Sequence, residues 1–212
     1  MHKGNARCVL VIINSTMVTA ALTGNIGMGK STVLKLFKEL GAATLESDAI
    51  VSRLLTMPQV LERIKALLGP KVFDPATGAL DRKKVSAIIF SDDDLRRQYE
   101  AILHPLVFEQ IQAAIRNVKT DVAIVEVPLL FEAAREGDFM YTITVYSDVG
   151  IAIDRMEGLG MTRAEAAERM MAQMPIAEKV QRASFTVDNN EDMRLTRVQV
   201  SKIMRALKAK AA

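Results

Sequence analysis

Residues 24–31 read Gly-Asn-Ile-Gly-Met-Gly-Lys-Ser, GNIGMGKS in one-letter code. Three glycines followed by Lys-Ser form the pattern of a P-loop, in which backbone amides surround phosphate oxygens. An apolar stretch at residues 17–23 predicts a strand before the loop, and apolar residues at helical spacing come after it. The segment therefore predicts an ATP-binding kinase domain of the P-loop NTPase type, with an α/β fold.

The positions of this loop have separate expected roles. Lys30 is expected to reach the β- and γ-phosphates of ATP, and the Ser31 hydroxyl to hold Mg²⁺. Thr32 adds a hydroxyl near the α-phosphate, and the helix that begins near Lys30 directs the positive end of its dipole at the same anion. The expected ATP-binding residues of this region are Gly24, Ile26, Gly27, Met28, Gly29, Lys30, Ser31 and Thr32.

Two other interpretations of the glycine-rich segment are disfavoured. A glycine-rich turn without a ligand would not need the Lys-Ser-Thr at the end of the loop. A dinucleotide-binding loop has the order Gly-x-Gly-x-x-Gly, whereas the order here is Gly-x-x-Gly-x-Gly.

The composition is that of a globular protein with mild charge. The 212 residues are half apolar and a quarter charged, which suits one α/β domain with inserted segments, or one large and one small domain. The net charge of +3 comes without a long basic run, so small phosphorylated ligands account for it as well as nucleic acid would. The apolar stretch from Cys8 to Ile13 is too short to span a bilayer. The single cysteine, Cys8, forms no internal disulfide, which fits a cytoplasmic setting.

Strand-like and helix-like patterns alternate along the chain, which predicts a parallel sheet covered on both faces. Strands are expected at residues 17–23, 42–45, 122–127, 141–146 and 185–187. Apolar stripes at helical spacing predict helices around residues 33–40, 60–68, 107–118 and 200–207. A capping box at 162–165 starts a helix that should run to Pro175.

The first sixteen residues differ in pattern from the rest of the chain. We interpret residues 1–16 as a dispensable extension and residues 17–212 as the functional domain. The alternative is an additional edge strand at Val9–Ile13.

A carboxylate comes directly after the second expected strand. Asp48 lies where an α/β fold binds its ligands, and it could accept a proton from an acceptor hydroxyl. Asp is also a favoured N-cap, so Asp48 could instead only cap a helix beginning at Ala49. Spacing alone leaves both roles open.

From Met17 to about Asn190 the chain resembles the dephospho-CoA kinase family. The segments that carry the resemblance occur in the order typical of that family: Thr23–Thr32, Glu46–Asp48, Gly78–Arg82, Phe90–Asp92, Leu103–Pro105, Val127–Glu132, Arg169–Pro175 and Asp188–Asn189. Each late segment is weak alone, but the ordered set is hard to obtain by chance.

The resemblance implies three parts and a reaction. The parts are a P-loop core, a helical section at about 49–115 that receives the acceptor, and a lid at about 150–180 that closes over ATP. The reaction transfers the γ-phosphoryl group of ATP, with Mg²⁺, to the ribose 3′-hydroxyl of dephospho-CoA. Both substrates are small molecules, and neither a nucleic acid nor a membrane is an expected partner.

The same resemblance assigns roles to residues outside the loop. Asp48 and Arg169 join Lys30 as catalytic residues, His104 lies with Asp48 at the acceptor, and Asn189 lies in the adenine loop. His104 precedes Pro105, which suits the first turn of a helix, so His104 could also be a flanking residue without a ligand.

Two segments depart from the family pattern. The lid is one residue short before Gly158-Leu159, so Arg155, Arg163 and Arg169 are all candidates to neutralise the transferred phosphate, with Arg163 favoured as a solvated helix residue. Asn190 stands where the family has glycine, and we expect it in a left-handed turn. Glu126 could help to position Mg²⁺ or be a buried hydrogen-bonding carboxylate.

Other functions remain as alternatives. The first is a nucleoside or nucleotide kinase with the same core. The second is a nucleotide-dependent switch or motor, which should hydrolyse ATP without a small acceptor.

Deletion of residues 1–16 should leave the fold and the activity nearly intact, because the domain pattern begins at Met17. We expect the melting temperature to change by less than about 3 °C, which corresponds to roughly 1 kcal/mol in a chain of this size. Thermal unfolding checks this, and a fall of many degrees would mean that Val9–Ile13 belongs to the sheet.

Overall fold

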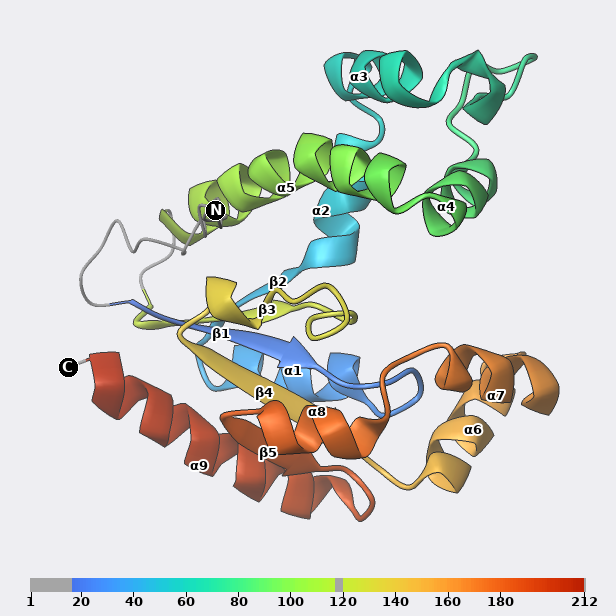
Figure 1. Ribbon diagram of the computed structural model, residues 1–212. Coiled ribbons are helices and arrows are strands. Elements are labelled where there is room, and N and C mark those ends of the chain that lie inside the picture. Colours follow the sequence, from blue (N-terminus) through green and yellow to red (C-terminus); the bar gives the residue numbers. More distant parts are fainter. Residues whose placement is uncertain (1–16, 117–119, 212) are drawn as a thin grey trace, which may run out of the picture. The chain divides into compact units, whose positions relative to one another are not determined.

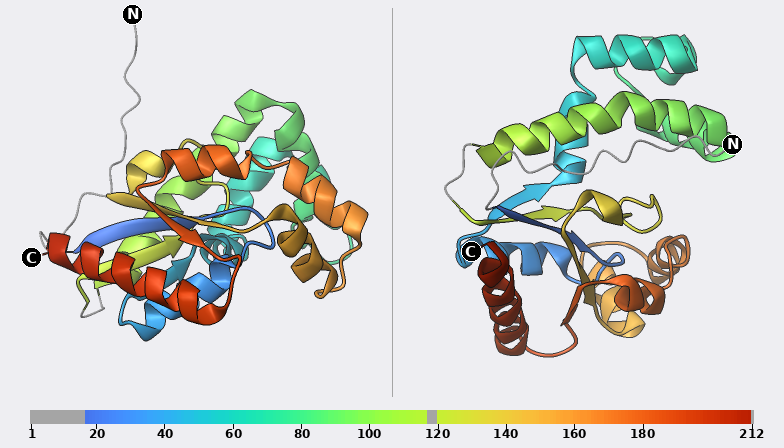
Figure 2. Two further views of the ribbon diagram at one scale, coloured as in Figure 1. Left: turned by 90° about the horizontal axis from the view of Figure 1, so that it is seen from below. Right: turned by 60° about the vertical axis from the view of Figure 1, so that its left-hand side comes forward.

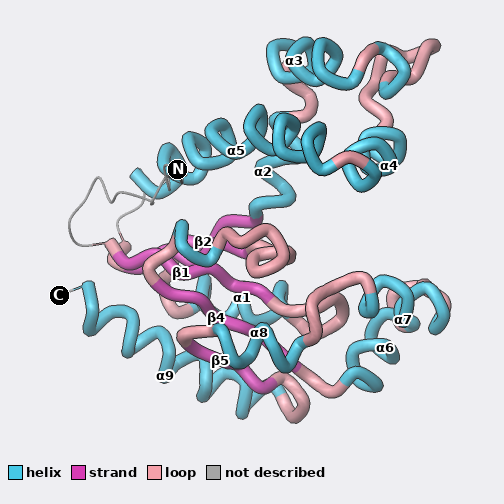
Figure 3. Tube along the Cα trace, in the orientation of Figure 1, coloured by secondary structure: helices cyan, strands magenta, loops and turns pink. Residues whose placement is uncertain are grey.

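The computed structural model describes residues 17–116 and 120–211, so the expected extension at 1–16 lies outside the described residues. The chain divides into two compact units. The first, residues 1–46 and 118–212, holds the sheet, and the second, residues 47–117, is helical. In Figure 1 the sheet and its helices can be followed from β1 to α9, and Figure 3 separates helices, strands and loops by colour.

Five parallel strands form the sheet of the first unit in the order β2-β3-β1-β4-β5. They are β1 (Val18–Thr23), β2 (Ala43–Glu46), β3 (Val122–Glu126), β4 (Tyr141–Tyr146) and β5 (Phe185–Asp188). Every side chain of β1 is buried, as expected for a central strand with both faces covered. The predicted parallel α/β sheet is confirmed, with strand ends within one residue of the expected ones.

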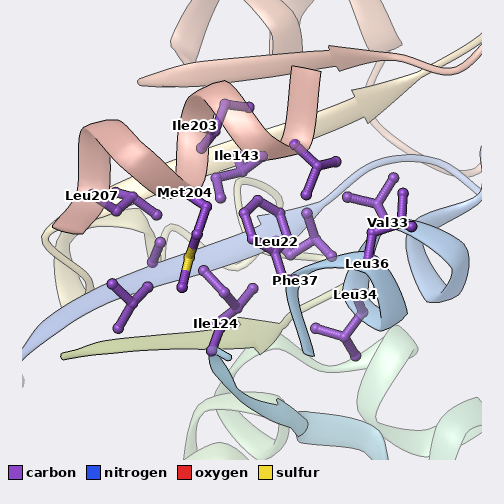
Figure 4. Packing of buried hydrophobic residues seen from close by; sticks show 14 of the residues in the cluster. Leu22, Val33, Leu34, Leu36, Phe37, Ile124, Ile143, Ile203, Met204 and Leu207 are labelled. Atoms are coloured by element: carbon purple, nitrogen blue, oxygen red, sulfur yellow. The ribbon is translucent and has the colours of Figure 1, made fainter. Parts of the chain in front are cut away.

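The helices of this unit are α1 (Lys30–Glu39), α6 (Val149–Glu157), α7 (Arg163–Met171), α8 (Ile176–Arg182) and α9 (Met193–Ala211), with a 3₁₀ turn at Glu136–Asp138. Helices α1 and α9 pack against each other and against the same face of the sheet, as the views in Figure 2 show. Their buried residues recur at helical spacing, and Figure 4 shows how Phe37 of α1 and Leu207 of α9 reach the residues of β1, β3 and β4.

The opposite face of β1 has different partners. Ala21 points to the face opposite that of Ala20 and Leu22, because side chains alternate along a strand. It packs against Leu130 and Phe131, with Met174 and Ala183 at the margin of the same cluster. Segments 127–139 and 174–183 therefore cover this face. A chain region that comes after α7 is thus part of the covering layer of the sheet.

The second unit consists of helices α2 (Ser47–Leu54), α3 (Pro58–Leu68), α4 (Arg82–Ser91) and α5 (Asp93–Arg116), with a 3₁₀ turn at Pro70–Val72. They enclose their own apolar cluster, which includes Val60, Ile64 and Leu68 of the predicted stripe in α3. The loop that precedes α4 is ordered by Asp74, whose carboxylate accepts from the amides of Ala76 and Thr77. These hydrogen bonds lower the pKa of the Asp74 carboxyl below its ordinary value, and the hydrogen bond from the Thr77 amide has the largest effect.

Pro105 lies inside α5, so the expected helix start at this position is wrong. Proline in a helix interior removes one hydrogen bond and crowds the preceding turn. Buried residues on both sides, Leu103 and Ile111, anchor the two halves of α5 by tertiary packing, which outweighs the local preference. His104 is consequently a half-buried residue in the middle of a long helix.

Helix α7 ends at Met171, four residues earlier than expected, although its capping box is formed as predicted by Thr162 and Glu165. The hydrogen bond from the Thr162 hydroxyl lowers the pKa of the Glu165 carboxyl. The chain leaves the helix because the amide of Met174 donates to Glu132 Oε1 instead of to a helical carbonyl. The short helix α8, next along the chain, is not predicted by the sequence pattern.

Two further expectations are wrong in detail. Helix α2 begins at Ser47, so Asp48 lies in its first turn and does not cap a helix that starts at Ala49. Asn190 is not in a left-handed turn, because Ala134 alone among the described non-glycine residues has a positive φ, of 51°. Asn190 acts through its side chain, which accepts from the Asp148 amide at 2.6 Å and donates to Asp188 Oδ1 at 2.8 Å.

None of the helices in the described part of the chain is long and apolar enough to cross a membrane.

Two leucines provide a matched test of the core. Leu207 is fully buried between α9 and the sheet, whereas Leu159 is 82% exposed in the turn after α6. Leu207→Ala should lower the free energy of unfolding by about 2–5 kcal/mol because it leaves a cavity. Leu159→Ala should change it by less than about 0.5 kcal/mol. Denaturant unfolding measures both values, and similar losses in the two variants would contradict this description of the core.

Candidate functional site

The phosphate loop joins β1 to α1 at the carboxyl edge of the sheet, where α/β folds place their ligands. Gly24 and Gly29 have φ angles of 145° and 89°, which side chains rarely adopt. A Cβ on Gly24 would lie 2.3 Å from the Val145 carbonyl oxygen, and one on Gly29 would lie 2.1 Å from Asn189 Nδ2. Glycine is thus required at both positions by conformation and by space.

The first turn of α1 presents the predicted phosphate ligands. Ser31 is exposed and Thr32 is half-buried, both next to the amides that begin the helix. The Lys30 ammonium donates to the carbonyl of Asn25 at 3.3 Å, so its side chain curls over the loop. The first turn therefore combines a cation, hydroxyls and a helix N-terminus, which is the donor set that binds a polyphosphate.

Some loop amides are already used within the protein. The amide of Ile26 donates to Gln173 Oε1 at 2.8 Å, and that of Met28 donates to the Asn25 carbonyl at 3.3 Å. Gly27, Gly29, Ser31 and Thr32 therefore contribute the other candidate amides for an anion.

Asn189 supports the loop from below. Its side chain is 5% exposed, donates to the Met28 carbonyl at 3.0 Å and accepts from the Thr196 hydroxyl at 3.1 Å. The carbonyl of Asn189 accepts from Arg155 at 2.9 Å. Asn189 therefore links the phosphate loop to α9 through hydrogen bonds of its buried side chain. Its expected contact with ATP stays a prediction.

The three candidate arginines of the α6–α7 segment have different surroundings. Arg155 donates to the carbonyls of Gly27 and Asn189, so it lies against the phosphate loop. Arg163 is 60% exposed and pairs with Asp154 and Glu157 of α6 at 3.1 and 2.9 Å. The hydrogen bond to Asp154 raises the pKa of the Arg163 guanidinium, which agrees with the expected surface role.

Arg169 is exposed in the last turn of α7, four residues before Gln173. Gln173 accepts a hydrogen bond from the Ile26 amide, so Arg169 is four residues away from a residue that contacts the phosphate loop.

Acidic residues mark the carboxyl ends of neighbouring strands. Glu126 ends β3, is half-buried, and lies in register with Leu22 of β1 and Glu46 of β2. Within the described ranges, no group of three or more His, Cys, Asp or Glu side chains is arranged to hold a metal ion.

In the helical unit, Asp48 is exposed in the first turn of α2. The same helix lines a pocket of about 330 Å³ whose walls are mainly apolar and include one guanidinium group. The lining residues are Ile50, Arg53, Leu54, Thr56, Met57 and Gln110. His104 lies on α5, the helix that contributes Gln110 to this pocket.

Sequence reasoning missed four residues that hold the phosphate loop or its neighbours: Asn25, Glu132, Gln173 and Lys179. The sequence does give a signal for Asn25. If this loop position required only flexibility, glycine would suffice, so an amide side chain there indicates a hydrogen bond. The other three are far from the loop in sequence, and only the fold brings them to it.

A comparison with known proteins covers the chain well beyond the phosphate loop. The family model described as Dephospho-CoA kinase matches residues 18–194. A dephospho-CoA kinase of Aquifex aeolicus is 34% identical over 193 residues, covering 90% of this chain and 98% of that protein. One of Geobacillus kaustophilus is 34% identical over 194 residues, covering 89% and 96%.

Solved structures agree with these sequence matches. The crystal structure of TT1252 from Thermus thermophilus superposes with a TM-score of 0.80 at 31% identity, covering 90% of this chain and 97% of that one. A dephospho-CoA kinase from Campylobacter jejuni, 24% identical with the same coverage and a TM-score of 0.60, shares the fold. With a family model that matches most of its length and relatives that it covers almost completely, the chain belongs to the dephospho-CoA kinase family.

Proposed function

We propose that this protein transfers the γ-phosphoryl group of ATP to the ribose 3′-hydroxyl of dephospho-CoA and so forms coenzyme A. The observation that carries the proposal is the family match over residues 18–194, because it includes the phosphate loop and the helical unit together. The loop geometry supports ATP as the donor, and the family supports dephospho-CoA as the acceptor. A cytoplasmic location agrees with the single cysteine.

The phosphate loop binds the triphosphate through charge and backbone amides. Lys30 releases the Asn25 carbonyl and turns to the β- and γ-phosphates, while Gly27 and Gly29 offer their amides. Ser31 fits a role at Mg²⁺, since this ion keeps several waters and needs only one or two protein ligands besides phosphate oxygens. When bound, Mg²⁺ neutralises charge that develops on the transferred phosphoryl group.

Asp48 serves as the general base for the acceptor hydroxyl in this proposal. It is exposed, lies two residues after the end of β2 and belongs to the first turn of α2, the helix that lines the pocket of the helical unit. A half-buried His104 and the pocket beside Arg53 supply polar and apolar surfaces for a nucleotide with a long organic arm. The helical section at about 49–115 is therefore assigned to the acceptor.

We assign the lid, expected at about 150–180, to α6 and α7, because the chain from Met174 onward covers the sheet. Arg155 holds the loop carbonyls, and Arg169 stabilises the transferred phosphate from the end of α7. Positioned cations of this kind are effective because phosphoryl transfer depends on geometry and charge more than on covalent help.

The function is tested by ATP consumption with and without dephospho-CoA. We expect consumption only with the acceptor, and no comparable rate with a panel of nucleosides and nucleoside monophosphates. Lys30→Ala should abolish turnover and keep the parental melting temperature, while Lys35→Ala, an exposed lysine of the same helix, should be active. Preference for a nucleoside acceptor, or ATP hydrolysis without an acceptor, would overturn the proposal.

Asp48→Asn should keep ATP affinity and lose phosphoryl transfer. A general base typically contributes ~10²–10⁴ in rate, so we expect kcat to fall at least about 100-fold at saturating Mg²⁺. Asn keeps the size of the side chain, and loss of one first-turn charge costs only about 0.3–1 kcal/mol of stability. Steady-state kinetics and calorimetric ATP titration measure both effects.

Asp93→Asn is the matched control, because Asp93 is an exposed carboxylate in the first turn of α5. It should retain parental kcat. A kcat for Asp48→Asn within roughly threefold of the parent, well below the contribution of a base, would remove Asp48 from the mechanism.

Arg169→Ala should reduce kcat far more than Arg163→Ala. We expect a loss of about 100-fold or more at Arg169, the size of effect seen when one transition-state donor is removed. Arg163 makes surface ion pairs, which contribute little to stability, so Arg163→Ala should keep the parental melting temperature and change kcat by less than roughly threefold. Equal losses in kcat would contradict this assignment.

A further inference from the structure

The segment between α7 and α8 is attached directly to the phosphate loop. Two successive loop residues bind two successive residues of this segment: Ile26 donates its amide to Gln173 Oε1 at 2.8 Å, and Asn25 Nδ2 donates to the Met174 carbonyl at 3.1 Å. Asn25 is 2% exposed, so its hydrogen bond is shielded from water. In Figure 3 this segment is the short loop that links α7 to α8.

An ion pair between buried Lys179 and Glu132, whose side chain is 21% exposed, holds the same segment from the other side. The amide of Met174 donates to Glu132 Oε1 at 3.0 Å, and that oxygen pairs with Lys179 Nζ at 2.7 Å. Lys179 has no exposed surface and also donates to the Pro128 carbonyl at 3.5 Å. The same carbonyl accepts from the Thr23 hydroxyl at the end of β1, so the network closes on the strand that leads into the phosphate loop.

The arrangement is more than packing requires. An apolar residue in place of Lys179 would fill the same space without the cost of desolvating an ammonium group, which the attraction to Glu132 only offsets. Here the carboxylate also fixes a backbone amide in the segment that binds the loop. The charges therefore define the place of Met174 and Gln173, which an apolar pair would not do.

We infer that Gln173, backed by the Glu132–Lys179 pair, is a positioning device that fixes the end of α7, and with it Arg169, relative to the phosphate loop. Arg169 lies in the last turn of α7, four residues before Gln173. When α6 and α7 move on ATP binding, Gln173 and Met174 are the fixed point of that movement. The inference rests on the proposed role of the lid and of Arg169.

The attachment itself is tested without enzyme activity. Hydrogen exchange at the Ile26 amide, followed by NMR, should be at least about tenfold faster in Gln173→Ala than in the parent, because the amide loses its acceptor. Gln181→Ala, an exposed glutamine of α8, is the matched control and should exchange like the parent. Unchanged exchange in Gln173→Ala would show that Gln173 does not hold the loop.

The catalytic consequence is tested by a double-mutant cycle with Arg169. Gln173→Ala alone should lower kcat about tenfold, with a parental melting temperature and a KM for ATP within roughly threefold. In the Arg169→Ala background the same change should lower kcat by less than about twofold, because the device acts through Arg169. An equal loss in both backgrounds would overturn the inference.

Failure of the proposed function would look different. If the parent does not phosphorylate dephospho-CoA, the function is wrong, and the exchange rate at Ile26 still decides whether Gln173 holds the loop.

The ion pair is tested with the double variant Glu132→Leu/Lys179→Met, which removes both charges at similar volume and should still fold. Exchange at the Met174 amide should become at least about tenfold faster, since its acceptor is gone. We expect kcat to fall at least roughly threefold in the variant, whose fold is verified by melting. A folded double variant with parental exchange and parental kcat would remove the ion pair from the device.

Discussion

The phosphate loop lies closer to its neighbours than any side chain would permit, and the rest of the site depends on this closeness. At Gly24 the neighbour is the backbone of β4, and at Gly29 it is the side chain of Asn189, just after β5. Three parallel strands, β1, β4 and β5, must therefore keep their register for the loop to keep its shape. The sheet therefore fixes the shape of the phosphate site, and the surrounding helices supply the side chains that lie next to it.

Sequence reasoning succeeds where a local pattern has one physical meaning. The loop, the capping box at Thr162 and the apolar strand at 141–146 each form as expected, because the conformational or burial demand is contained in a few adjacent residues. It fails where distant residues decide. Pro105 has the local character of a helix start, but packing on both sides of it keeps α5 continuous. Helix α7 ends at Met171 because the Met174 amide donates to Glu132 Oε1.

The candidate site shows the same division. Lys30 and Ser31 can be predicted as phosphate-site residues from spacing alone, because they directly follow the glycines at a helix N-terminus, which attracts anions. Resemblance assigns Asn189 to the ATP site, which stays a prediction, and the structure adds that its buried side chain supports the loop backbone. This hydrogen bond could not be predicted from local sequence, because its partner, the Met28 carbonyl, is more than half the chain away. The acceptor side rests on family membership, as the helical unit carries no pattern comparable to GNIGMGKS.

The strand order has a consequence for how the chain acquires its structure. Among the strands that the structure describes, β1 and β2 come first along the chain, yet they do not pair with each other, since both bind β3. The whole helical unit lies before β3 in the sequence, so β1 cannot pair with β3, as Val18 does with Val122, until the helical unit has been synthesised. Synthesis proceeds at about 5–20 residues per second, which leaves an apolar strand without its sheet for several seconds. The helical unit is one continuous stretch of chain, so it can fold in that interval, and the nascent chain should be most prone to aggregation just before β3 emerges from the ribosome.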